Sequence, residues 1–344
     1  MSIHSNIKKQ LIKEESLIFM IIFFILWNLG FHILVYFPLD QSPDIQNYLA
    51  MAQLDFDQSP VRRYRIIIPF LAYFINLIFG WFFNLFHPWS FEGNFSLCFS
   101  FFLINTTIMS FVMVMIYKLC KSFQIGFWYC LVAIVAVLSS RWTAELSGLP
   151  LVDSLYLLSL VFALYGLKTK QWSYLIASIW IGPWAKEAFI FMVPLILLFA
   201  KTEKLNLLKH LVLSGILVFG FRFLFDYYFG NDWTHSIKED LTSFTSIGIS
   251  LSRLFSFHGL YDLFSVVGFW ILLPLLAYLK YRNNFLTIYT DNLLLFNSYL
   301  LIVLLQALLS TDLSRMFYLA IPVLAVWIAI SLKTLQIEVI DKSE

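Results

Sequence analysis

The sequence predicts an all-α, polytopic membrane protein in which about ten helices cross the bilayer. Of the 344 residues, 60% are hydrophobic and 13% are charged, and the mean hydropathy is +0.80. Soluble domains have about 45–50% apolar and about 25% charged residues. Apolar runs long enough to cross the hydrocarbon core recur along the whole chain. A water-soluble core could not cover so much Phe, Leu and Ile, so the surrounding solvent must be lipid.

The first predicted span is the apolar run 17–37, which follows Lys8, Lys9 and Lys13. The run is too long for the core of a signal peptide and lacks a small-residue cleavage site, so it predicts a retained membrane helix. Further apolar runs follow at 66–87, 95–117, 124–140, 150–167, 172–183, 187–200, 207–229, 262–279, 293–310 and 313–332.

The run 66–87 is interpreted as lying on the outer surface of the membrane. It contains Pro69 and Gly80 among many aromatic residues, a composition that suits one interfacial helix or two short ones. Without this run, ten spans remain and both termini are cytoplasmic. Lysines then gather near the cytoplasmic helix ends, as the positive-inside rule requires. An ordinary span at 66–87 remains the alternative.

This topology makes residues 1–344 a single membrane domain. Its long outer loops are 38–94, which carries the juxtamembrane helices, and 230–261. Loops of such length inside a compact protein usually carry function. Asp44 and Tyr48 stand four residues apart in the first loop, which places them on one face of a short helix.

Arginines concentrate on the predicted outer face. Seven of the eight arginines lie there, whereas 13 of the 15 lysines lie on the cytoplasmic side. A guanidinium presents a planar fork that binds phosphate or carboxylate at two points, which an ammonium group does not. The polarity of long loops explains part of this distribution, but not the charges at the mouths of helices.

Five charged residues lie in or beside predicted spans, where each charge costs about 2.5–3.5 kcal/mol. Asp153 lies near the start of one span, Lys186 and Glu187 interrupt another, and Asp312 and Arg315 open the last. Broken helices are tolerated where they line a polar cavity. Helix capping by the aspartates and a neutral Lys–Glu pair are the structural alternatives. Because all five share one predicted face, the sequence predicts an outward-facing polar cavity.

Several segments also resemble a known family. They are Asp44, Tyr48 and Ala52 in the first loop, PFLAYFINLIFG (69–80), GLPLVDSLYLL (148–158) with Asp153, GPWAKEAFIFMVP (182–194), and Asp312 with Arg315 before Pro322. Their order resembles the GT-C superfamily of membrane glycosyltransferases, of the mannosyltransferase and aminoarabinose-transferase kind. The family's acidic pair in the first loop is here Asp44 alone, with Asp40 four residues earlier.

The resemblance implies an inverting glycosyltransferase in the inner (plasma) membrane of a bacterium. Such an enzyme moves a sugar from a polyprenyl-phosphate carrier to an acceptor hydroxyl on the outer membrane face. The acceptor must lose a proton, so a carboxylate within reach serves as general base. Asp44 is the expected base, with Asp153 or Glu145 as the second choice.

The leaving phosphate needs cations aimed at its developing charge. The expected donor phosphate-binding residues are Arg63, Arg65, Arg141, Lys186 and Arg315. The expected supporting residues are Tyr48, Tyr64, Glu145, Glu187 and Asp312. A divalent metal ion, Mg or Mn, would bind if Asp44, Asp153 and Glu145 converge, because hard cations prefer oxygen ligands.

A transporter or flippase of a lipid-linked sugar or an anionic solute is the alternative. Broken helices with a charged pair are also typical of transporters, although the sequence contains no internal repeat. An intramembrane protease lacks the expected GxSxG or HxxxH motif. The sugar and the acceptor, whether glycan, lipid or protein, are not specified by these loops. The net charge of +2 does not suggest a nucleic-acid partner.

Overall fold

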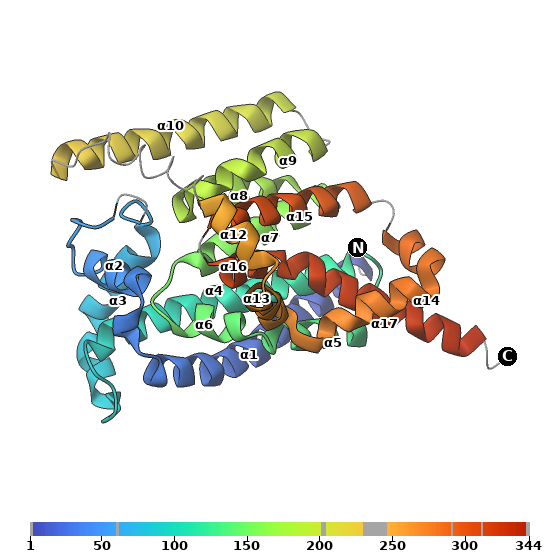
Figure 1. Ribbon diagram of the computed structural model, residues 1–344, viewed down its shortest axis with the longest axis horizontal. Helices are drawn as coiled ribbons and strands as arrows, with labels where there is room; N and C mark the ends of the chain where they lie inside the picture. Colours follow the sequence, from blue (N-terminus) through green and yellow to red (C-terminus); the bar gives the residue numbers. More distant parts are fainter. Residues whose placement is uncertain are drawn as a thin grey trace.

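The computed structural model describes residues 3–59, 62–200, 204–229, 246–289, 292–310 and 312–341. Every regular element in these ranges is a helix, which confirms the all-α class (Figure 1). In chain order the elements are α1 (Ile3–Tyr36), η1 (Leu39–Gln41), α2 (Pro43–Met51), α3 (Ile67–Phe83), η2 (Asn84–Phe86), α4 (Phe95–Lys121), α5 (Phe127–Leu138), α6 (Arg141–Gly148), α7 (Asp153–Thr169), α8 (Trp172–Ala185), η3 (Glu187–Phe191), α9 (Met192–Phe199), α10 (Lys204–Phe229), α12 (Ser246–Leu254), α13 (Phe257–Val267), η5 (Gly268–Ile271), α14 (Leu272–Tyr289), α15 (Leu293–Leu308), α16 (Leu313–Phe317), η7 (Tyr318–Ala320) and α17 (Ile321–Asp341).

Six of the described segments are long and apolar enough to cross a membrane. They are Lys13–Tyr36, Ile67–Phe86, Phe95–Lys121, Lys204–Phe229, Phe257–Arg282 and Leu313–Gln336. The pair α5 and α6, bent by 70°, makes a seventh if it is counted as one span. The chain is therefore a multi-pass membrane protein. The count of ten spans and the surface position of 66–87 stay predictions, and by length α3 with η2 could also cross.

The core of the molecule is formed by α4 and α7, which pack against each other. In α4, 72% of the residues in its 18-residue apolar stretch are buried. Helix α1 packs on α4 and α6, and α8 packs on α7. The approach of α1 to α6 depends on two glycines, because a Cβ atom on Gly148 would lie 2.4 Å from the carbonyl oxygen of Gly30. Small residues at such crossings let the helix backbones approach closely in membranes.

A buried amide holds the turn between α6 and α7. The Asn105 side chain, on α4, donates to the carbonyls of Leu149 and Leu151, both at 2.9 Å, and accepts from the Ser154 hydroxyl at 2.6 Å. Leu149, Leu151 and Ser154 are all buried, so these bonds satisfy polar groups that water cannot reach. The turn therefore sets where α7 begins, which is at Asp153.

The break predicted at Lys186 and Glu187 is present. Helix α8 ends at Ala185, the backbone of Lys186 is extended (φ −163°, ψ 139°), and η3 begins at Glu187. Pro183 lies in the last turn of α8 and lacks the N–H of a regular helix. Gly182 gives room for the returning chain, because a Cβ atom there would lie 2.1 Å from the Phe189 ring.

The two ends of the molecule differ in what they contain. In Figure 1, α1 begins and α17 ends toward one end, and α2 and α3 lie at the opposite end. Helix α10 runs along one edge of the molecule, and 11% of the residues in its 18-residue apolar stretch are buried. The first predicted outer loop is thus remote from the described beginning and end of the chain. This arrangement agrees with the predicted topology, although the sides of the membrane stay a prediction.

Candidate functional site

Asp44 is held by two arginines from distant parts of the chain. It lies in the first turn of α2, after Pro43. Its Oδ1 accepts from Arg62 Nε at 2.5 Å, and its Oδ2 accepts from Arg315 Nη1 at 2.6 Å. Arg315, in α16, is separated from Asp44 by 271 positions in the sequence. The Asp44 side chain keeps 14% of its surface exposed, so a ligand can still reach it.

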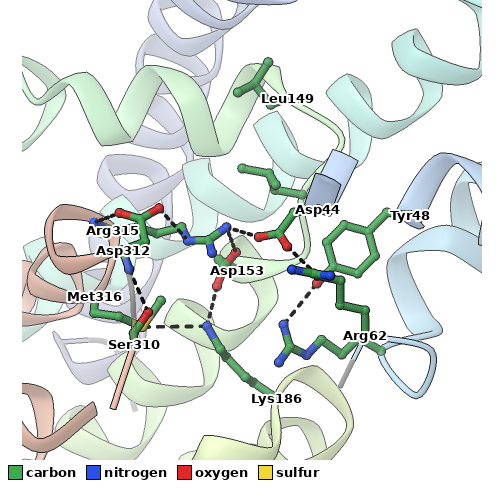
Figure 2. A network of polar contacts seen from close by, with 12 residues as sticks. Asp44, Tyr48, Arg62, Leu149, Asp153, Lys186, Ser310, Asp312, Arg315 and Met316 are labelled. Carbon is green, nitrogen blue, oxygen red and sulfur yellow. Dashed lines mark hydrogen bonds and ion pairs between the residues drawn. The ribbon is translucent and has the colours of Figure 1, made fainter. Parts of the chain in front are cut away.

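Arg315 joins three carboxylates into one network. Beside its bond to Asp44, its Nη1 lies 3.7 Å from Asp153 Oδ2, and its Nε lies 3.3 Å from Asp312 Oδ2. Lys186 Nζ donates to Asp153 Oδ1 at 2.9 Å. Figure 2 shows these side chains converging from separate elements around the Arg315 guanidinium. The break after α8 thus delivers a lysine to the first turn of α7.

Glu187 is the centre of a second group. Its Oε2 accepts from Arg65 Nε at 3.1 Å and Nη2 at 3.0 Å, and its Oε1 accepts from Arg222 Nη2 at 2.8 Å. Arg65 Nη1 also donates to the Tyr48 hydroxyl at 3.0 Å. Tyr48 lies on α2 with Asp44 and is fully buried. It therefore links the second group to the helix that carries Asp44.

A third, buried group attaches the first loop to α10. Arg63 Nη2 lies 2.9 Å from Asp226 Oδ1, and the Tyr64 hydroxyl donates to Asp226 Oδ2 at 2.5 Å. The guanidinium of Arg222, on the same helix as Asp226, lies 4.7 Å from the centre of the Tyr64 ring. Such cation–π contacts are stronger where water is excluded. The segment from Arg62 to Arg65 thus contacts all three groups.

The charges of the first loop are set by these partners. Burial alone would raise the pKa of the Asp44 carboxyl, but Arg315 and Arg62 outweigh it and hold the pKa below its ordinary value. Burial raises the pKa of Tyr48 to about 12, so its hydroxyl stays protonated. Burial lowers the pKa of Arg65, but Glu187 outweighs it and holds the pKa well above the ordinary value. At neutral pH the loop therefore presents an ionised carboxylate, a neutral phenol and a cation.

The structure brings together most of the site residues that the sequence predicts. The network contains Asp44, Tyr48, Arg63, Tyr64, Arg65, Asp153, Lys186, Glu187, Asp312 and Arg315. Arg141 and Glu145 instead pair with each other on α6. Glu145 lies close enough to Asp312 and Arg315 for electrostatic interaction, so this pair stands beside the network.

The predicted metal site depends on the convergence of Asp44, Asp153 and Glu145. In the structure the guanidinium of Arg315 lies between Asp44 and Asp153, and Glu145 bonds to Arg141. Within the described ranges, no three Asp, Glu, His or Cys side chains gather in a way that could hold a metal ion. A divalent metal stays an untested prediction.

Two members of the network, Arg222 and Asp226, are absent from the site residues that the sequence predicts. Arg222 and Asp226 stand one helical turn apart inside the apolar run 207–229, where charges are costly. The criterion that singled out Asp153 would have found them. Of the second predicted outer loop, 230–245 lies outside the described residues, and the remainder forms α12 and the beginning of α13.

Comparison with known proteins finds no matching family model, no similar curated protein and no similar solved structure.

Proposed function

We propose that the protein is a glycosyltransferase that moves a sugar from a polyprenyl-phosphate carrier to an acceptor hydroxyl on the outer face of a bacterial inner membrane. The observation that carries this proposal is the Asp44 carboxylate, bound by Arg62 and Arg315 beside the Lys186–Asp153 pair. Sugar transfer from a lipid phosphate needs a carboxylate to accept a proton and cations to stabilise the leaving phosphate. Both kinds of group meet here, within an apolar chain that lipids can approach.

In this proposal Asp44 is the general base, and the bound donor prepares it. A carboxylate whose pKa is held low is a weak base, and both Asp44 oxygens are paired in the absence of substrate. A bound donor competes for the same guanidinium groups. When it draws Arg315 or Arg62 away, the pKa of Asp44 rises toward its ordinary value and one oxygen is freed for the acceptor hydroxyl.

Asp153 suits a positioning role better than that of the base. Its side chain is 3% exposed and contacts both Lys186 and Arg315. Removing a buried carboxylate from two cations leaves those charges uncompensated. Asp153 therefore orients two cations of the site, whereas the more exposed Asp44 faces the substrates.

The test is turnover of polyprenyl-phosphate sugars by the purified protein, measured as release of polyprenyl phosphate. Asp44→Asn keeps the shape of the side chain but removes the base, so we expect the rate to fall at least about 100-fold. Asp40→Asn is the matched control, because Asp40 belongs to the same loop but is exposed, and it should retain the wild-type rate. Full activity of Asp44→Asn would remove Asp44 from the role of base.

The second candidate is a transporter or flippase of a lipid-linked sugar or anionic solute. The extended residue between α8 and η3, with its buried Lys186–Asp153 pair, is the observation that favours it. Reconstituted protein that binds the donor panel and moves it across the vesicle membrane, without releasing polyprenyl phosphate, would favour this function over transfer.

A further inference from the structure

An apolar groove lies between α10 and the broken segment formed by α8, η3 and α9. The cavity has a volume of about 390 Å³. Ile179 and Val193 line one wall and Leu211 and Val218 the other, and Glu187 and Arg222 stand at one end. The groove therefore combines hydrocarbon walls with a charged terminus, as a lipid with an ionic head group requires.

The helix α10 is built in a way that keeps this groove wide. Its few buried side chains include Leu207, Ser214 and Val218, and the Ser214 hydroxyl donates to the Ile179 carbonyl at 2.9 Å. Gly215 lines the groove, and apart from its chain neighbours and the adjacent backbone of α10, no atom of the described residues lies within 4 Å of a Cβ atom placed on it. Glycine in a helix interior is less favourable than alanine. The absent side chain leaves space that protein atoms in the described part of the chain do not fill.

The charged end of the groove has an excess of positive charge. Glu187 and Arg222 line this end of the groove. Next to them, Arg65 pairs with Glu187 and Arg63 pairs with Asp226, so three arginines meet two carboxylates. Among the described residues, no hydrogen-bond acceptor reaches the buried Nε atom of Arg222. Buried polar groups are nearly always hydrogen-bonded, and guanidinium groups bind phosphate with two parallel bonds. A phosphate at this end would supply both the charge and the acceptors.

We infer that this groove binds the isoprenoid chain of the polyprenyl-phosphate carrier, with its phosphate at Arg222 and Arg65. The identity of the lipid rests on the proposed function. The groove has charged lining residues at one end only, and this fits a lipid whose phosphate carries a single hydrocarbon chain. Tyr48 joins Arg65 to α2, so a sugar on this phosphate would extend toward Asp44. Of the five residues that the sequence predicts for the donor phosphate, this position uses Arg65, and it adds Arg222.

Two glycine variants on one helix test the groove. Gly215→Leu fills it, whereas Gly220→Leu is the matched control, because Gly220 also has open space around its Cβ position and does not line the groove. Leucine favours helix in both positions, so neither change should impair folding. We expect Gly215→Leu to weaken binding of polyprenyl phosphate by purified protein at least tenfold and Gly220→Leu to leave it unchanged. Equal affinities of Gly215→Leu and wild type would overturn the inference.

The phosphate contact is tested with Arg222→Gln and four ligands of defined chemistry. Wild-type protein should bind polyprenyl phosphate at least tenfold more tightly than polyprenol, phosphatidylglycerol or inorganic phosphate, and Arg222→Gln should remove most of this preference. Equal binding of phosphatidylglycerol would make the groove a site for ordinary membrane lipid. Equal binding of inorganic phosphate would show that the chain contributes nothing. Either result would overturn the inference.

The inference and the proposed function fail in different ways. In one outcome, polyprenyl phosphate binds to wild type, Gly215→Leu blocks this binding, and no sugar is transferred from any donor. This outcome would support the groove and contradict the glycosyltransferase. Sugar transfer with an unchanged donor KM in Gly215→Leu would support the glycosyltransferase and contradict the groove.

Discussion

The helices α4 and α10 have similar lengths and compositions but opposite surroundings. Both are long, uninterrupted and apolar enough to cross a membrane. Yet 72% of the apolar stretch of α4 is buried, whereas only 11% of the apolar stretch of α10 is buried. In the middle of α4, the polar residues Ser100, Asn105 and Thr106 are small, uncharged and fully buried. In α10 the polar residues near the far end are Arg222 and Asp226, and two glycines with open surroundings, Gly215 and Gly220, precede them.

This difference teaches that hydropathy identifies a membrane helix without telling what the helix faces. Lipid tails are as apolar as leucine, so burial against protein or exposure to lipid requires no change in apolar content. The discriminating signal is the kind of polar residue. Small uncharged groups in mid-helix mark contacts between helices, as Asn105 does, and charges mark a group of ion pairs such as the one around Arg222.

The largest effect on stability is expected when a glycine in the packed core is compared with a glycine on α10. Gly148→Leu on α6 forces apart two backbones that nearly touch, and we expect it to destabilise the protein by about 3 kcal/mol. Gly220→Leu on α10 meets open space and should leave the thermal midpoint of the purified protein unchanged or slightly raised. A similar loss in both variants would mean that α10 is packed as closely as α1 and α6.

A smaller loss is expected when Asn105 of α4 is replaced. Asn105→Leu leaves the buried carbonyls of Leu149 and Leu151 without their donor, and unmet buried groups of this kind cost about 2 kcal/mol. Thr107→Val is the control, since the Thr107 hydroxyl bonds only to the Leu103 carbonyl of its own helix and contributes little. The measurement is the thermal midpoint, and equal midpoints for both variants would contradict a special role of Asn105.

A local effect is expected at the attachment of α10. Asp226→Asn weakens the contacts with Arg63 and Tyr64 but keeps the shape of the side chain. We expect local opening of the end of α10 to become about tenfold more frequent, which corresponds to about 1.4 kcal/mol. Hydrogen exchange measured by mass spectrometry should rise in α10 and stay constant in α4. A uniform rise in both helices would show that α10 does not open independently.

The smallest effect concerns pH. The pKa of Asp44 is held below its ordinary value of 3.8, so its ion pairs contribute stability above that value and lose it as the pH falls through the lowered pKa. Between pH 8 and 5, the difference in thermal midpoint between wild type and Asp44→Asn should therefore be constant, and it should narrow below about pH 4. A difference that already shrinks between pH 7 and 5 would mean that Arg62 and Arg315 do not control this carboxyl.

The sequence by itself determines the features that depend on neighbouring residues. Apolar runs predict membrane helices, the charges Lys186 and Glu187 inside an apolar stretch predict the break there, and the spacing of Asp44 and Tyr48 predicts one helix face. The class of the protein, the break and a short helix in the first loop are all present. The number of spans and the position of 66–87 are left undetermined because hydropathy does not distinguish a surface helix from a crossing one.

Only the tertiary structure decides which charges meet. Asp44 pairs with Arg315, which lies 271 positions away in the sequence, and Arg65 pairs with Glu187, which lies 122 positions away. No periodicity encodes such pairs, because they depend on how helix packing brings α2, η3 and α16 together. The same packing leaves the groove along α10 open, and it turns a set of costly single charges in the sequence into one connected site.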